Sequence, residues 1–220
     1  MIATNIGATS GEATSEPRAA AISFITTEHF TLQGARSATI AESTGRASTF
    51  LASVSGGLVA LGLVATATGV GGAFYAFGLV LLPTLAFVGL VTFERTLQSG
   101  IEDLGYARRI ARLRAFYFDK APELAPYLLS VEHRLLAEGI QRGYYLQGFR
   151  TVAGMVGVIT AVLAGSETGL GVSAAFDAPA AALASGCVIA LAVLFALMQY
   201  QRRAWARAVT QPITEEPVPT

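Results

Sequence analysis

The residue types that usually carry chemistry are scarce in this chain. Its two histidines, His29 and His133, lie far apart, and neither has a histidine or cysteine neighbour at the spacing of metal ligands. Cys187 is the single cysteine, which excludes an intrachain disulfide framework and a thiolate metal cluster. The sequence therefore predicts no metal site and no cofactor.

Enzyme motifs are missing as well. The chain has no His-Glu-x-x-His, no Gly-x-Ser-x-Gly, no P-loop and no dinucleotide fingerprint. Ser55 and Ser185 each precede a glycine, which resembles the Ser-Gly pair of a membrane serine protease. A serine nucleophile needs a base, however, and the apolar segments around both serines hold no histidine. We therefore expect a protein that is not an enzyme.

The composition points to a lipid environment. Of the 220 residues, 53% are hydrophobic and 14% are charged, whereas soluble domains have about 25% charged residues. Fifteen Lys and Arg residues balance fifteen Asp and Glu residues. This neutral balance argues against a nucleic-acid-binding protein. The missing surface charge indicates that much of the surface faces a lipid bilayer.

Charge-free segments define four predicted membrane spans. No ionisable Lys, Arg, Asp, Glu or His lies between Arg46 and Glu94, which leaves room for two spans of about 20 residues each. A glycine-rich turn at 67–72 separates them, so the first hairpin occupies 47–93 with spans at about 48–67 and 73–93. Pro83 falls midway along the second span and predicts a kink.

A second predicted hairpin occupies 151–201, with spans at about 151–166 and 178–200 and an intervening loop at 167–177. Asp177 and Pro179 fit the start of the fourth helix. The third span is short, at about 24 Å against a hydrocarbon core of about 30 Å. A full crossing extended by residues 144–149 is the favoured interpretation, and a re-entrant segment is the alternative.

The basic residues indicate the orientation. All of them precede the first span, lie between the second and third, or follow the fourth, and none is in the two connecting loops. The positive-inside rule places both termini and residues 94–150 in the cytoplasm. The bias toward Arg and Ala suggests a GC-rich bacterial genome, and hence a multi-pass protein of a bacterial cytoplasmic membrane. Basic residues at the span ends act as topology anchors: Arg46, Arg95, Arg150, Arg202 and Arg203.

The remaining segments complete an all-α fold, with four transmembrane helices as two hairpins and a cytoplasmic helical hairpin between them. The hairpin, 94–150, consists of a helix that continues the second span to about Lys120 and a helix at about 127–145. Residues 1–20 are predicted to be a disordered tail, 21–46 an interfacial helix, and 202–220 a cytoplasmic tail. Whether the two membrane hairpins are a true repeat stays open.

Small residues recur at four-residue spacing in three spans, which lets helix backbones approach closely in lipid. Such rows serve either packing within one bundle or self-association. They are Ala52, Gly56 and Ala60 in the first span, Ala153, Gly157, Ala161 and Gly165 in the third, and Ala182, Gly186 and Ala190 in the fourth.

Several runs of the chain resemble a group of uncharacterised integral membrane proteins from high-GC Gram-positive bacteria: Thr27–Phe30, Gly45–Ser48, Ser55–Gly62, Leu81–Leu85 and Gln98–Leu104. The resemblance covers most of 25–165 and implies a membrane location but no activity. In layout alone, the chain is also similar to two-span bacterial defence effectors with a cytoplasmic helix.

The sequence thus predicts a non-enzymatic membrane protein that self-associates, or docks an unknown cytoplasmic protein through 94–150. The alternatives are an oligomeric pore or small-solute permeation protein, and a membrane-acting defence effector.

Overall fold

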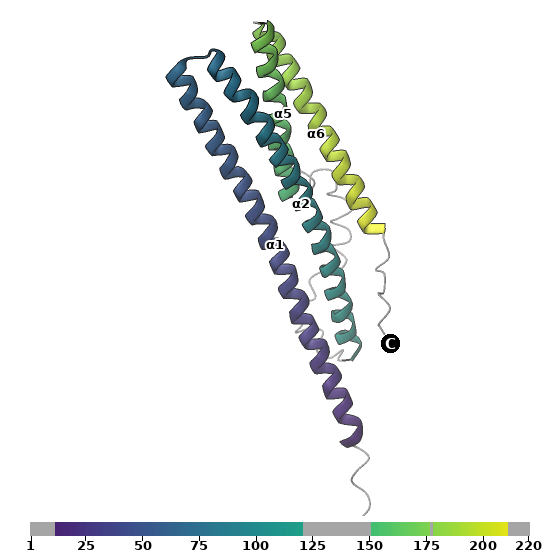
Figure 1. Ribbon diagram of the computed structural model, residues 1–220. Helices are drawn as coiled ribbons and strands as arrows, with labels where there is room; N and C mark the ends of the chain where they lie inside the picture. The colour runs from purple at the N-terminus through teal and green to yellow at the C-terminus, as the bar shows by residue number, and fades with distance from the viewer. Residues whose placement is uncertain (1–11, 121–150, 177, 211–220) are drawn as a thin grey trace, which may run out of the picture. The chain divides into compact units, whose positions relative to one another are not determined.

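Four long helices make up the described part of the chain. The structure, a computed structural model, describes residues 12–120, 151–176 and 178–210, and these contain no strand. The all-α prediction is confirmed. In chain order the helices are α1 (Glu12–Thr68), α2 (Gly72–Lys120), α5 (Val152–Phe176) and α6 (Pro179–Thr210) (Figure 1).

Each of these four helices is long and apolar enough to cross a membrane. Large apolar side chains on their outer surfaces are exposed, among them Leu63, Val80 and Phe195, each about two-thirds accessible. A water-soluble protein rarely exposes apolar surface on this scale. The helices therefore support a multi-pass membrane protein.

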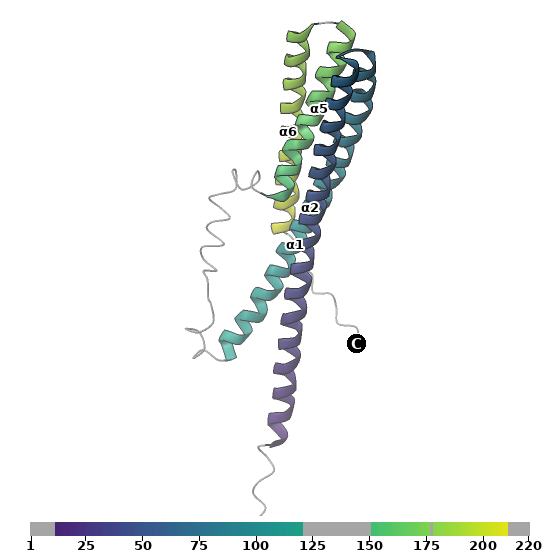
Figure 2. The ribbon, with the colours of Figure 1, turned by 90° about the vertical axis from the view of Figure 1, so that its left-hand side faces the viewer.

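The chain divides into two compact units. Among the described residues, one unit, the stem unit, combines 12–38 with 103–120, and the other, the bundle unit, combines 39–102 with 151–176 and 178–210. Within the bundle unit, the α1–α2 turn and the α5–α6 turn lie at the same end, which we call the turn end (Figure 2).

The α1–α2 turn forms where the glycine cluster predicts it. α1 ends at Thr68 and α2 begins at Gly72. Gly69 has a φ of +71°, a left-handed conformation that glycine adopts without steric cost. The amide of Gly71 donates to the carbonyl of Gly69 at 3.1 Å, which tightens the connection.

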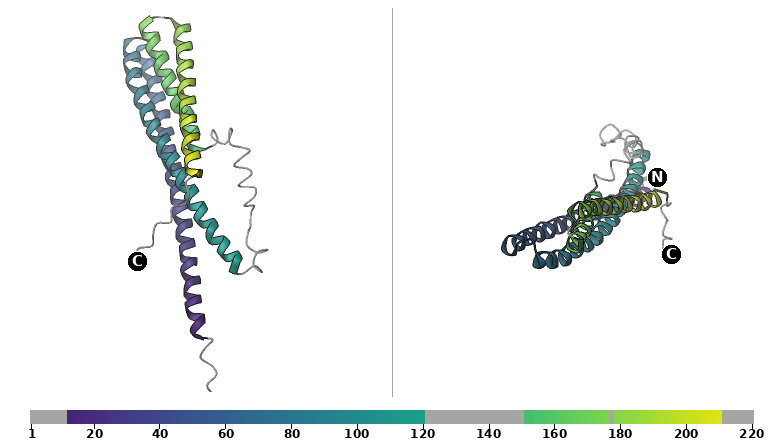
Figure 3. Two further views of the ribbon diagram at one scale, coloured as in Figure 1. Left: turned by 90° about the vertical axis from the view of Figure 1, so that its right-hand side faces the viewer. Right: turned by 90° about the horizontal axis from the view of Figure 1, so that it is seen from above.

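Each of the four helices contributes at least one side chain to the core of the bundle unit. Phe50 of α1, Phe93 of α2 and Val156 of α5 are at most 1% exposed. Leu197 of α6 joins the same cluster. Figure 3 shows α5 and α6 as an antiparallel pair in this unit. The two charge-free segments thus pack together through their largest buried side chains.

α1 is longer than the sequence predicts. A tail at 1–20, an interfacial helix at 21–46 and a span at about 48–67 were expected, whereas a single helix runs from Glu12 to Thr68. The predicted disorder is therefore wrong for residues 12–20. Helix extension is cooperative, and an established span can propagate through a flanking segment that would not form a helix alone.

α2 follows the prediction more closely. It passes through Pro83 without interruption and continues to Lys120. Proline removes the amide that would bond to the carbonyl of Leu79, and membrane helices tolerate this loss. The second predicted helix of the hairpin, 127–145, lies outside the described residues.

α5 corrects the predicted loop at 167–177. The helix has 25 residues and continues to Phe176, which gives a length of about 38 Å. That length exceeds the hydrocarbon core of about 30 Å, so a full crossing needs no help from residues 144–149. Gly169 and Gly171 were interpreted as loop residues, but Gly169 is a close-packing position against α6.

The stem unit pairs the first part of α1 with the last part of α2. Arg36 donates from Nε to Oδ1 of Asp103 at 2.7 Å and from Nη2 to Oδ2 at 3.4 Å. The hydroxyl oxygens of Thr26 and Tyr117 lie 3.4 Å apart. The hydrogen bond to Asp103 raises the pKa of Arg36, burial lowers it, and the carboxylate charge adds to the rise. Arg36 therefore stays cationic at any physiological pH.

Candidate functional site

The small residues of α5 and α6 bring these two helices into backbone contact. A Cβ atom at Gly186 would lie 2.8 Å from the carbonyl oxygen of Gly165, and one at Gly169 would lie 3.0 Å from that of Ala182. The first distance is shorter than real Cβ atoms show, and the second is tighter than nine in ten real Cβ contacts. A Cβ at Gly165 would collide with Gly186 and with Ala190. The small-residue rows of α5 and α6 therefore pack these two helices together within one chain.

The earlier part of the α5 row meets α2. Gly157 is buried, and a Cβ there would lie 3.1 Å from the ring of Phe93. Ala153 and Ala161 are 4% and 1% exposed. From the α2 side, Gly89 leaves room for the hydroxyl of Thr160 and for the ring of Phe50. α1, α2 and α5 thus meet at one closely packed level.

The α1 row differs from the other two, because it faces outward. Ala52 and Gly56 are exposed, Ala60 is half-buried, and a Cβ at Gly56 would meet nothing within 4 Å. Ser48, four residues before Ala52, is exposed as well. We call Ser48, Ala52 and Gly56 the α1 outer row. Within the described residues, this row packs against no other helix.

The opposite side of α1 carries the helix's contacts within the bundle. Phe50 and Val54 are 1% and 8% exposed. A Cβ at Gly57 would lie 2.9 Å from a methyl group of Leu85. Phe50, Val54 and Gly57 therefore pack α1 against its neighbours in the bundle. The α1 outer row makes none of these contacts.

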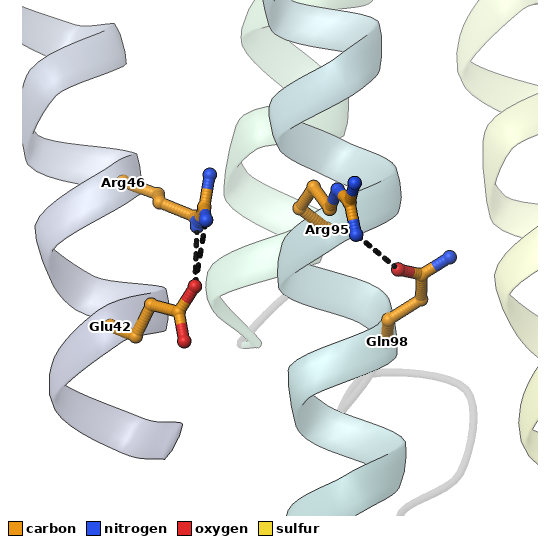
Figure 4. Close-up of polar contacts among 4 residues, drawn as sticks. All are labelled: Glu42, Arg46, Arg95 and Gln98. Carbon is orange, nitrogen blue, oxygen red and sulfur yellow. Dashed lines mark hydrogen bonds and ion pairs between the residues drawn. The ribbon is translucent and has the colours of Figure 1, made fainter. Parts of the chain in front are cut away.

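The predicted topology anchors do not converge on a site. Arg46 donates to Glu42 one turn earlier at 2.7 Å and 3.0 Å, and Arg95 donates to Gln98 at 3.5 Å (Figure 4). Arg202 is half-buried and Arg203 is exposed. Arg150 lies outside the described residues. Pairing within the same helix fits a role at the membrane interface, where charged side chains fix helix ends.

The described residues contain no arrangement that would do bond chemistry. No group of three His, Cys, Asp or Glu among them could hold a metal ion. The hydroxyl of Ser185 donates to the carbonyl of Ala182 at 3.0 Å, and Ser55 is exposed. His29 lies in the stem unit, 2.9 Å from the amide nitrogen of Gln33. No contact described for Ser55 or Ser185 places a general base beside the hydroxyl.

Two buried polar residues of the bundle unit were not singled out by the sequence analysis. Gln201 of α6 is 3% exposed and donates to the hydroxyl of Thr151 at 3.1 Å. Thr160 is 4% exposed and donates to the carbonyl of Val156. Gln201 stands directly before Arg202 and Arg203, at the polar end of the apolar segment, so the sequence offered no signal that set it apart. Gln201 therefore links α6 to the residue that directly precedes α5, whereas Thr160 bonds within α5.

Comparisons of the chain with protein-family models, with curated proteins and with solved structures found no match.

Proposed function

We propose that this chain is a non-enzymatic membrane protein that self-associates through the α1 outer row. The observation that supports it is the contrast among the three rows of small residues. The small residues of α5 and α6 pack against helices of the same chain, whereas the α1 outer row is exposed.

An exposed row of small residues favours helix association in a bilayer. In a bilayer, lipid tails are as apolar as leucine, so helices associate through close backbone packing rather than through the hydrophobic effect. A row of small residues on an exposed face offers that close approach to a second copy. Exposed Val59 and Leu63 lie beside the row and would supply the van der Waals contacts around it.

Docking of a cytoplasmic protein through 94–150 stays a prediction, since residues 121–150 lie outside the described part. The pore and the defence effector also stay predictions, because no described feature favours either. The cytoplasmic orientation of both termini belongs to the same proposal and rests on the distribution of basic residues.

Cysteine cross-linking in native membranes tests the proposal. In a Cys187→Ala background, Ala52→Cys is expected to give a disulfide-linked dimer on mild oxidation. Phe87→Cys is the matched control, because Phe87 is 67% exposed on α2, away from the row. Equal cross-linking at both positions would indicate random collision and contradict the proposal.

A further inference from the structure

Glu167 is an acidic residue inside a helix that is apolar enough to cross a membrane. Because α5 runs from Val152 to Phe176 without interruption, Glu167 lies 15 residues after its first residue and nine before its last. These intervals correspond to about 22 Å and about 14 Å along the helix. Within the described residues of 47–93, 151–176 and 178–201, it is the only Lys, Arg, His, Asp or Glu.

The packing of α5 against α2 gives the depth of this carboxyl in the bundle unit. A Cβ atom at Gly89 would meet the hydroxyl of Thr160, and one at Gly78 would meet the side chain of Leu170. The two helices therefore run in opposite directions along each other. Interpolation between these two contacts places Glu167 at the level of residues 81–82 of α2.

That level is far from both ends of the charge-free segment. Leu82 is ten residues after Gly72, where α2 begins, and twelve before Glu94, the next charged residue. These intervals correspond to about 15 Å and about 18 Å along α2. Since the hydrocarbon core of a bilayer is about 30 Å thick, Glu167 lies close to its middle.

No positive charge balances this carboxyl. Glu167 is half-buried, and within the described part of the chain it has no hydrogen bond and no ion pair. The other titratable side chains in the described charge-free segments are Tyr75, Cys187 and Tyr200. None of these three can become a cation.

A carboxyl in such surroundings is stable when it is neutral. An ionised carboxylate without a counter-charge is costly in hydrocarbon, and a bound proton removes that cost. A metal ion would need several more oxygen ligands, and the described residues contain no group of three acidic, His or Cys residues that could hold one. The proton is therefore the ligand that fits a single carboxyl.

The proton also has an acceptor at this depth. Pro83 lacks the amide that would bond to the carbonyl of Leu79, and this carbonyl is directed along α2 toward the level of Glu167. The side chain of Leu79 lies 3.8 Å from the Cβ position of Gly171, one turn of α5 after Glu167. A neutral carboxyl has one O–H to donate, whereas a carboxylate has none.

We propose that Glu167 is a proton-binding site inside the membrane, and that its carboxyl takes up and releases a proton as the pH changes. Intramembrane carboxyls of this kind form the proton relays of pumps and transporters. The site goes beyond self-association. It lies on α5, apart from the α1 outer row, so that proton binding and self-association can fail independently.

Labelling with dicyclohexylcarbodiimide tests this site, because this apolar reagent enters the bilayer and adds to a carboxyl that holds a proton. Membranes that contain the full chain are treated over a range of pH, and peptide mass spectrometry locates the label. A water-soluble carbodiimide is the reagent control. Glu167→Gln removes the site, and Glu94→Gln is the matched control, because Glu94 is exposed at the end of the charge-free segment.

We expect the apolar reagent to label Glu167, and the labelled fraction to rise as the pH falls. The label should be lost in Glu167→Gln and kept in Glu94→Gln. Absence of label at Glu167, or equal labelling by the water-soluble reagent, would overturn the proposal, because the carboxyl would then be ionised or face water. Protection by sodium ions at constant pH would also overturn it, because a metal ion would then occupy the site.

Discussion

Glycine has opposite surroundings at two positions of this chain. At Gly186, the backbone of α5 occupies the space that a side chain would need, whereas at Gly56 that space is empty. The sequence shows both as members of a small-residue row and does not distinguish them. The difference depends on which face of each helix meets a neighbour, and this is set by tertiary packing.

Leucine at these two positions should therefore have different effects on stability. Gly186→Leu should lower the free energy of unfolding by about 1–3 kcal/mol, because the added side chain must force α5 and α6 apart. In the separated single chain, Gly56→Leu should leave it within about 0.5 kcal/mol, because nothing in that chain packs against Gly56. Titration with a denaturing detergent, followed by circular dichroism, measures both. Equal losses would show that the two glycines are equally packed.

A second residue-level prediction concerns Arg36 and Asp103. Their side chains are 43% and 27% exposed, and the contact is bidentate. A double-mutant cycle with Arg36→Gln and Asp103→Asn should give a coupling of about 0.5–1 kcal/mol, which falls as salt rises. A coupling of zero at low salt would mean that the pair contributes nothing to the stem unit.

At the level of elements, the charge-free segments predict the four helices, and the glycine cluster predicts the α1–α2 turn. The end of α5 and the start of α1 were missed for different reasons. Gly169 is a packing residue that looks like a turn residue, and α1 continues beyond the segment that its own pattern supports. The partner of the α2 extension was also missed, because Arg36 and Asp103 lie far apart in sequence and nothing local links them.

The stem unit gives an element-level test. With Cys187 replaced by alanine, the pair Thr26→Cys and Tyr117→Cys should be joined by a short bifunctional thiol reagent, because the native hydroxyls lie 3.4 Å apart. Phe24→Cys with Tyr117→Cys is the control, since Phe24 is 76% exposed. Gel mobility after proteolysis between the two helices reads out the link. Linkage of the control pair alone would refute the contact.

For the whole molecule, the distribution of basic residues predicts the orientation. Val70, which is 69% exposed in the α1–α2 turn, should lie outside, and the exposed Arg203 of α6 should lie inside. Single cysteines at these positions in a Cys187→Ala background can be labelled with a membrane-impermeant maleimide on intact spheroplasts. We expect labelling at 70 directly and at 203 only after permeabilisation. The reverse pattern would invert the proposed topology.

Self-association through the α1 outer row is tested most directly by the mass of the intact assembly in lipid nanodiscs. Native mass spectrometry should find the wild type with two copies or more and Gly56→Leu with one, because leucine blocks the close approach of α1 to a second α1. Gly62→Leu is the matched control, since Gly62 is also exposed on α1 with nothing near its Cβ position but lies outside the row. A wild type with one copy, or a Gly56→Leu variant with the wild-type copy number, would contradict the account.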